Sequence, residues 1–386
     1  MFEKKVRALQ LLVLFLSLFL LAGPVNAAKA PEAGEGNETV IMRGRVTAVE
    51  NMEPAVEVED YVEIEQLAEI EITSGDHQGE THSLLNALMG HPYFDITLEE
   101  GSEVLLWGEV DGDGQLRTVY LQDHLRDRYV YLIAGLFILL LLLVGGRKGI
   151  VTIITLGITV LAVFRLLLPL LLRGYAPIPA TVLVATGVTL ITIIMIGGLH
   201  RKTFAAVIGT VGGVLVAGLL ALYVGNAASL TGFSSEDAQM LLFMEGGAID
   251  VRGLLFAGII IGALGAVMDV AMSIAAASYE VYAVNPAITI REQIKSGMNV
   301  GRAVMGTMAN TLILAYVGAS VPLLLLFMGY DTPYITIINS DLVATEVVRA
   351  LAGSIGIIAA VPLTAVSAGL LRKFGKQPKV ENTVDS

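Results

Sequence analysis

Residues 253–277 read GLLFAGIIIGALGAVMDVAMSIAAA, an apolar run that holds one acid, Asp269. About 20 consecutive apolar residues suffice for a helix to cross a bilayer, so this run predicts a membrane-spanning helix. A carboxylate at membrane depth costs about 2.5–3.5 kcal/mol, and such residues face a packed interior or a wet cavity. Asp269 is therefore the first candidate for a functional residue.

Small residues accompany Asp269 at helical spacing. Gly258, Gly262, Gly265 and Ser273 recur at intervals of three or four residues around it. This spacing places them on the face of the helix that carries the acid. Because small residues let helices approach closely, we expect a partner helix to pack against this stripe.

The composition is that of a membrane protein with an acidic polar segment. Of the 386 residues, 55% are hydrophobic and 16% charged, too apolar for an ordinary soluble domain. Residues 28–128 hold 23 acids and 6 bases, whereas the rest of the chain is mildly basic. The basic footprint of a nucleic-acid-binding protein is absent, so no nucleic-acid partner is predicted. Without cysteine, disulfides and thiolate chemistry are excluded.

The N-terminal region predicts an exported β domain. Residues 1–28 have a basic start, an apolar centre and a small-residue cleavage site, which indicates a signal peptide or an uncleaved signal anchor. Residues 29–39 form an acidic linker. Residues 40–128 show short period-2 segments separated by turn residues, which predicts a small extracytoplasmic all-β domain, a barrel or a sandwich.

Seven membrane-spanning helices are predicted within residues 129–372, followed by a cytoplasmic tail at 373–386. Positively charged loops favour the cytoplasmic side, which places the β domain outside and the C-terminus inside. The predicted spans are 129–145, 150–172, 178–199, 203–225, 253–277, 303–327 and 347–371. The orienting basic residues are Arg147, Lys148, Arg201, Lys202, Arg291, Lys295, Arg302, Arg372, Lys373 and Lys376.

Two loop segments predict short helices. Residues 286–297 follow a capping Asn285, begin with Pro286 and end at Gly297, which is typical of a short interfacial helix with Ile290 and Ile294 facing the membrane. Residues 235–244 are amphipathic and predict a re-entrant or surface helix.

Polar residues in the sixth span fall near the depth of Asp269. At 1.5 Å per residue, Asp269 and Asn310 both lie roughly 7 Å to the cytoplasmic side of the midplane. Such a group could coordinate a cation, relay a proton or hold a polar solute; alternatively, its amide and hydroxyls only satisfy the acid. The candidate substrate- or ion-binding residues are Asp269, Ser273, Thr307, Asn310 and Thr311, with Asn299 and Arg302 at the inner interface.

At the outer ends of the fifth and seventh spans lie two acid–base pairs. They predict either a cross-helix ion pair acting as an outer gate or separate interfacial charges that extend to water. The four residues are Asp250, Arg252, Glu346 and Arg349. The histidines of the β domain match no closed zinc pattern, and no nucleotide-binding or hydrolase motif occurs, so neither a metal, a cofactor nor an enzymatic activity is predicted.

Two long stretches carry a family resemblance: GLLFAGIIIGALGAVMDVAMSIAAASYE and SGMNVGRAVMGTMANTLILAYVG. On these, the chain resembles the YibE/F-like family of bacterial multi-pass membrane proteins. The resemblance implies a plasma-membrane protein that is suspected to be a permease, and it names no substrate. The family often has an acid after the Gly-Arg pair, where this chain has Ala303, which leaves more weight on Asp269.

Together these features predict a polytopic α-helical membrane protein with a small N-terminal all-β domain. Its predicted function is a permease or transporter of a small solute or ion, with Asp269 as the binding or coupling group. The alternative is a non-transporting assembly factor or sensor whose outer β domain binds a partner. Besides the lipid bilayer, the candidate partners are a second copy of the chain, or a separate membrane protein or ATPase.

Overall fold

The computed structural model describes residues 38–53, 62–243 and 249–372. The chain divides into two compact units, with the boundary between Leu140 and Leu141. The predicted signal sequence, nearly all of the predicted linker and the predicted C-terminal tail lie outside the described residues.

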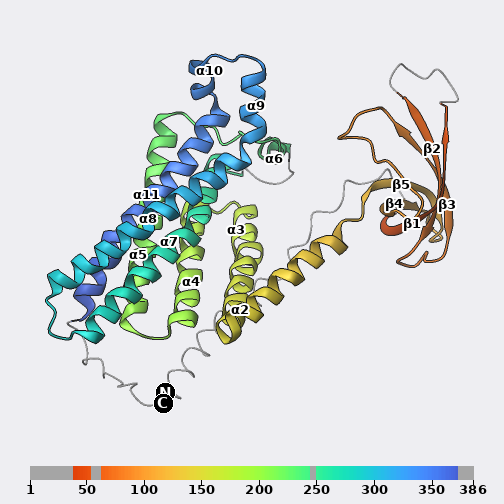
Figure 1. Ribbon diagram of the computed structural model, residues 1–386. Helices are drawn as coiled ribbons and strands as arrows, with labels where there is room; N and C mark the ends of the chain where they lie inside the picture. The colour runs from red at the N-terminus through yellow and green to blue at the C-terminus, as the bar shows by residue number, and fades with distance from the viewer. Residues whose placement is uncertain (1–37, 54–61, 244–248, 373–386) are drawn as a thin grey trace. The chain divides into compact units, whose positions relative to one another are not determined.

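The first unit is a curled antiparallel sheet of five strands in the order β3-β2-β1-β4-β5 (Figure 1). The two edge strands, β3 and β5, contact each other, so the sheet forms a partly open barrel of the general kind found in OB-folds. The predicted all-β, barrel-like domain is therefore confirmed. The strands are β1 (Glu38–Met52), β2 (Ile64–Ile72), β3 (Thr81–Leu88), β4 (Glu103–Val110) and β5 (Leu116–His124).

Alternation along the strands builds the core of this β unit. Every second residue of β4 is buried, and the same alternation runs through most of β2, as the period of two requires. One buried position in β2 is polar: Gln66 is 3% exposed and bonds to both backbone groups of Leu98. The apolar core consists of Met42, Val46, Ala68, Ile70, Ile72, Leu84, Leu98, Val104, Leu106 and Val119.

The second unit is helical, and the first long helix begins before it, since its residues up to Leu140 belong to the first unit. Among the described residues, six helical stretches are long and apolar enough to cross a membrane, the first being the 46-residue run Asp127–Leu172. The helices are α2 (Asp127–Ala162), η1 (Val163–Leu167), α3 (Leu168–Leu172), α4 (Pro177–Gly197), α5 (Arg201–Ala227), α6 (Glu236–Met240), η2 (Leu241–Phe243), α7 (Val251–Val284), α8 (Ile290–Ala319), α9 (Val321–Gly329), α10 (Tyr334–Asn339) and α11 (Asp341–Leu371).

The run Asp127–Leu172 covers the first two predicted spans. At 1.5 Å per residue it would measure about 69 Å if straight, twice the thickness of a hydrocarbon core. It is not straight, because Gly146 has a φ of 52° and a ψ of −127°, outside the helical region. Seven crossings stay a prediction, and the six candidate stretches are what the described helices contain.

The predicted interfacial helix at 286–297 is wrong as a separate element. Its residues from Ile290 onward are the first turns of α8, which continues to Ala319. Thr289 starts α8 with a capping box, in which Thr289 and Glu292 bond to each other's backbone amides. Ile290 and Ile294, which were predicted to face the membrane, lie next to Gly369 of α11.

The predicted helix at 235–244 is partly confirmed. The described part of this segment forms α6, with the Ser235 hydroxyl accepting from the Ala238 amide at its start, and then η2. Residue 244 lies outside the described residues.

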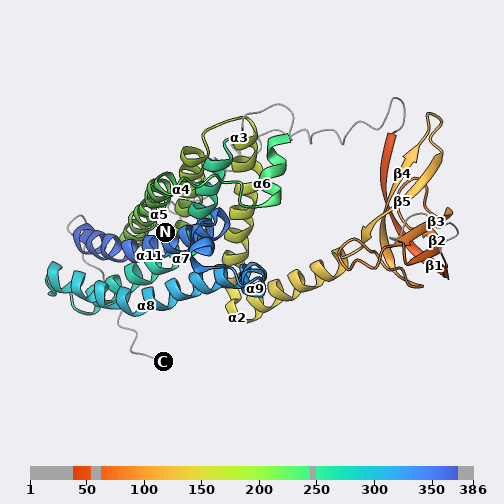
Figure 2. The same cartoon turned by 90° about the horizontal axis from the view of Figure 1, so that it is seen from above.

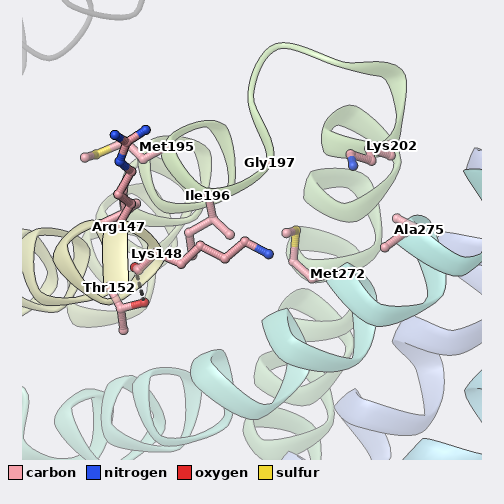
Figure 3. Close-up of a pocket in the computed structure, with 11 residues that line it drawn as sticks. Arg147, Lys148, Thr152, Met195, Ile196, Gly197, Lys202, Met272 and Ala275 are labelled. Atoms are coloured by element: carbon pink, nitrogen blue, oxygen red, sulfur yellow. Dashed lines mark hydrogen bonds between the residues drawn. The ribbon is translucent and has the colours of Figure 1, made fainter. Parts of the chain in front are cut away.

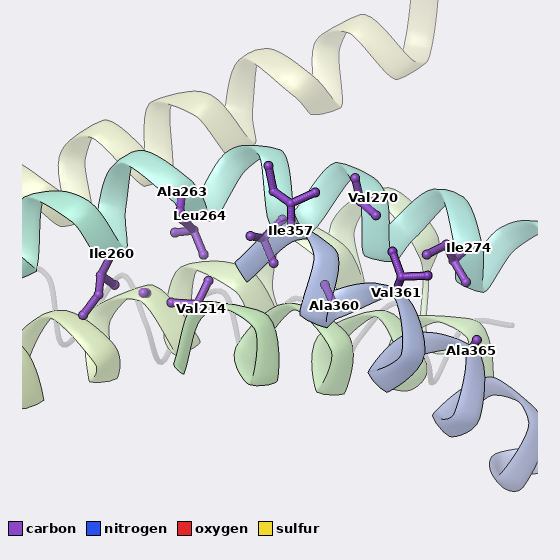
Figure 4. Close-up of a cluster of buried hydrophobic side chains, with 12 residues drawn as sticks. Val214, Ile260, Ala263, Leu264, Val270, Ile274, Ile357, Ala360, Val361 and Ala365 are labelled. Carbon is purple, nitrogen blue, oxygen red and sulfur yellow. The ribbon is translucent and has the colours of Figure 1, made fainter. Parts of the chain in front are cut away.

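Helices α5, α7 and α11 form the centre of the helical unit (Figure 4). Gly213 of α5 and Gly356 of α11 make this packing possible, since a Cβ at either position would lie within 2.8 Å of the other's carbonyl oxygen. Helix α8 lies beside α11 and α7 at the surface of the unit (Figure 2). The central cluster includes Val214, Ile260, Ala263, Val267, Ile274, Ile357 and Val361.

Candidate functional site

Asp269 lies in the middle of α7, the candidate span with the largest buried share of residues. Its neighbours Val267, Val270 and Ala271 are fully buried, whereas Asp269 is exposed on the surface of the single chain. Its carboxylate forms no ion pair or hydrogen bond with any other residue that the structure describes. The acid is thus carried on an open face of an otherwise packed helix.

The small residues predicted to share this face do so. Gly258, Gly262, Gly265 and Ser273 are all exposed, like Asp269. A Cβ at Gly258 or Gly265 would meet no atom within 4 Å. The expected partner helix is therefore not found against the stripe within the described chain, where only the Tyr316 hydroxyl reaches it, at Gly262.

Helix α8 runs antiparallel to α7 in a register fixed by glycine contacts. A Cβ at Gly297 would lie 2.6 Å from the Ser278 hydroxyl, and one at Gly301 would lie 2.9 Å from Ile274. Continued outward, this register places Asp269 level with Gly306, one residue before Thr307. Asn310 and Thr311 follow about one turn further outward.

The hydroxyl groups of the candidate site are already used as donors. Ser273 donates to the carbonyl of Asp269 at 2.8 Å, and Thr311 donates to the carbonyl of Thr307 at 2.8 Å. Thr307 itself donates to Val304. Since a hydroxyl has one proton and two lone pairs, these oxygens have only acceptor sites left to offer. Such a set, together with a carboxylate, suits a cation or a hydrogen-bond donor.

No described side-chain contact joins Asp269 to the α8 candidates. Thr307, Asn310 and Thr311 are exposed, and the nearest structural relation between the two sets is their common level. At the inner end of this face, Arg302 donates to Asn299 at 3.4 Å, one turn of α8 apart. The structure therefore gives two open polar faces, on adjacent helices.

The four outer candidates have other partners than the predicted cross-helix pair. Asp250 caps α7 through the Gly253 amide at 2.8 Å, and Arg252 donates to the carbonyl of Gly225 at the end of α5. Glu346 and Arg349 pair with each other at 2.7 Å within α11. The contacts of Asp250 and Arg252 lie at helix ends, and no ion pair between α7 and α11 is found among the described residues.

A pocket lined by basic residues lies further along α7 (Figure 3). It was not predicted from the sequence. It has a volume of about 520 Å³ and is lined by Arg147 and Lys148 of α2, Lys202 of α5, and Met272 and Ala276 of α7. From the sequence, these basic residues were used only to predict which loops face the cytoplasm. Two basic pairs in two loops on the same predicted side were the signal that could have located it.

In the β unit, two of the histidines considered as metal ligands, His77 and His82, contact an acidic residue instead. Glu80 lies between His77 and His82, at 3.0 and 3.2 Å. The hydrogen bonds to His77 and then to His82 lower the pKa of Glu80 below its ordinary value. Among the described residues, no cluster of three or more potential ligands has a metal-binding arrangement.

The long apolar helices among the described residues are those of an integral membrane protein. A family model described as YibE/F-like protein matches residues 133–374, which is more than half of the chain. The chain therefore belongs to the YibE/F-like family, and the resemblance seen in its sequence is confirmed. No curated protein and no solved structure matches the chain.

Proposed function

We propose that this protein is a permease or transporter of a small solute or ion, with Asp269 as the binding or coupling carboxylate. The observation that carries the proposal is the placement of Asp269: unpaired among the described residues, on an open glycine face, and at about the level of Thr307 on the neighbouring helix α8. A carboxylate left in lipid costs about 2.5–3.5 kcal/mol. A bound cation, a proton or a polar solute would offset that cost.

The proposed membrane is the bacterial plasma membrane, with the β unit outside and the C-terminus in the cytoplasm. The positively charged loops support this orientation. Because the chain has no cysteine, a single introduced cysteine is the only thiol that a maleimide can label. Glu236→Cys, in the α5–α7 loop, should react with a membrane-impermeant maleimide in intact cells, and Lys295→Cys in α8 only after lysis. The reverse pattern would overturn the orientation.

The test of the site is the thermal unfolding of the full chain in detergent, followed by circular dichroism of the helices. Wild type and Asp269→Asn are compared across pH and a panel of cations and metabolites. A ligand present at 100 times its dissociation constant stabilises the native state by about 2.7 kcal/mol. We expect a pH- or ligand-dependent shift in wild type that disappears in Asp269→Asn.

The matched control is Glu280→Gln, which neutralises another exposed acid on the same face of α7, three turns further along. It should keep the wild-type shift. If all three proteins melt alike under every condition, Asp269 binds nothing in the panel and the transporter proposal loses its support. If Glu280→Gln also loses the shift, the effect belongs to surface charge and not to Asp269.

The alternative function, an assembly factor or sensor, is favoured by one observation on the β unit. Tyr93 and Phe94 are 83% and 68% exposed and stack edge to face, with their ring centroids 5.0 Å apart. Exposed aromatic pairs are typical of binding surfaces for other proteins. Replacement of both by serine should leave transport intact under the first proposal, and should abolish function under the alternative.

A further inference from the structure

The basic pocket contains positive charge that the protein itself does not neutralise. Among the described residues, the side chains of Arg147 and Lys148 form no ion pair and no hydrogen bond. Lys202 lies over the Tyr279 ring, 5.5 Å from its centroid, and pairs with no acid that the structure describes. Three cations without a counter-charge around one cavity indicate a site for an anion.

These cations come from two helices, α2 and α5, and all three line the same pocket. Arg147 and Lys148 directly follow the break at Gly146, whereas Lys202 lies in the first turn of α5. Figure 3 shows the Lys148 side chain extended toward Met272, between the α2 and α7 walls. The wall of the pocket therefore contains two basic residues of α2 and one from the first turn of α5.

The start of α5 adds to this potential. Its N-cap residue, His200, does not cap the helix with its side chain, which instead bonds to the carbonyl of Gly197 at 2.9 Å. The N-terminus of a helix carries a partial positive charge, and its free amides favour phosphate groups. Here it supplements the side-chain cations and does not act alone.

Apolar side chains in the pocket wall also indicate what kind of ligand would fit. No acid lines the pocket, and the rest of its wall is largely apolar, from Met195, Ile196 and Met272. The nearest acids along α7 are Asp269, one turn before Met272, and Glu280, one turn after Ala276. A cavity of about 520 Å³ whose wall combines cations with methionine and isoleucine side chains fits an anionic group attached to an apolar body.

We propose that this pocket binds a phosphate group with net negative charge, presented by an anionic phospholipid headgroup or by a small soluble phosphate. Arginine pairs with phosphate in two parallel hydrogen bonds, and lysines act as point charges beside it. The site is separate from the role proposed for Asp269 and does not depend on transport.

The experiment uses the full chain in a zwitterionic detergent. It is titrated in parallel with short-chain phosphatidylglycerol, short-chain phosphatidylcholine and sodium phosphate, with sodium chloride at matched ionic strength. Binding is measured by calorimetry and by the thermal midpoint. The test variant is Lys148→Gln with Lys202→Gln, and the matched control is Arg291→Gln with Lys295→Gln, which removes two exposed charges of α8 outside the pocket.

We expect wild type and the control to bind phosphatidylglycerol or phosphate, and the test variant to bind about thirty-fold more weakly, since each cation near an anionic headgroup contributes about five-fold. Binding of phosphatidylglycerol alone identifies a lipid site; binding of phosphate as well identifies a site for the phosphate group itself. The charge-preserving variant Lys148→Arg with Lys202→Arg should retain binding, which separates lost charge from misfolding.

Three results would overturn the proposal. Wild type could bind neither phosphatidylglycerol nor phosphate beyond the chloride reference. Phosphatidylcholine could bind as tightly as phosphatidylglycerol, which would remove the requirement for net charge. The α8 control could lose as much affinity as the pocket variant, which would attribute binding to the general surface charge of the protein.

Discussion

Gln66 of the β unit provides a quantitative test of how this unit is held together. It is 3% exposed, and its amide makes four hydrogen bonds. The amide nitrogen donates to Asn51 and to the carbonyl of Leu98, at 3.0 and 3.2 Å. The amide oxygen accepts from the Leu98 amide at 2.9 Å and from Asn86 at 3.2 Å. The Gln66 side chain thus bonds to both the amide and the carbonyl of Leu98, in the segment before β4.

Gln66→Ala would leave the amide and the carbonyl of Leu98 without partners in a buried position, since Leu98 is 2% exposed. A buried polar group that loses its partner costs about 1–3 kcal/mol, so the two together predict a loss of about 2–6 kcal/mol in the free energy of unfolding. The usual stability of a domain is about 5–15 kcal/mol, so this loss is large.

The assay uses the only tryptophan of the chain, Trp107 in β4, which packs on Tyr120 with ring centroids 4.8 Å apart. Its fluorescence follows the unfolding of the β unit within the full chain in detergent. With a slope of about 2 kcal/mol per molar urea, a loss of 4 kcal/mol moves the midpoint by about 2 M. The matched control, Gln78→Ala, removes an exposed glutamine and should stay within about 0.5 kcal/mol of wild type.

A Gln66→Ala midpoint within the range of Gln78→Ala would refute the reasoning. It would mean that water replaces the amide without cost, and that the segment around Leu98 is held by its apolar contacts alone. Gln66→Leu separates these contributions, because it keeps the volume and removes the hydrogen bonds.

Three further predictions concern packing, pH and helix capping. Gly213→Ala should lower the thermal midpoint of the helical unit, since its Cβ would lie 2.7 Å from a backbone oxygen of α11, whereas Gly258→Ala, with no atom within 4 Å, should not lower it; equal midpoints would contradict the packing argument. Because Glu80 has a lowered pKa, its contribution to the stability of the β unit is present above the ordinary glutamate pKa and is lost as the pH falls through its own lower value. In His77→Gln the urea midpoint should therefore fall less steeply as the pH drops below the ordinary glutamate pKa; an unchanged slope would show that the pair does not set this pKa. Thr289→Ala should destabilise the helical unit by about 1 kcal/mol through loss of the α8 cap, measured by thermal unfolding, and an unchanged midpoint would show that the cap is not needed.

The architecture followed from local patterns in the sequence. Alternation along residues 64–72 and 103–110 predicted strands, and those strands carry the β core. The apolar runs located the spanning helices because a helix in lipid satisfies its own backbone, whatever surrounds it. Failures occurred at boundaries: the Asn-Pro pair at 285 looked like a helix start, but the capping box of Thr289 lies just beyond it and leads into one long α8.

The candidate site could be predicted only in part, because sequence spacing gives the face of a helix and not what lies opposite that face. The spacing correctly put the small residues around Asp269 on one face. It could not show that this face is open in the single chain, since that depends on where α2 and α8 pack. The basic pocket was missed for the same reason, as Lys148 and Lys202 are brought together only by the arrangement of three helices.

The tight packing of α5, α7 and α11 has a consequence for motion. Glycines at the α5–α11 contact leave the backbones no room to shift without collision, so these three helices act as a stationary frame. Helix α8 is joined to this frame by contacts of the same kind, since a Cβ at Gly301 would collide with Val361 of α11 and one at Gly297 would lie 2.6 Å from the Ser278 hydroxyl of α7. A movement of α8 along α7 would have to break these contacts. The relative levels of Asp269 and Thr307 are therefore set by the packing of the helices, and not by contacts between the two residues.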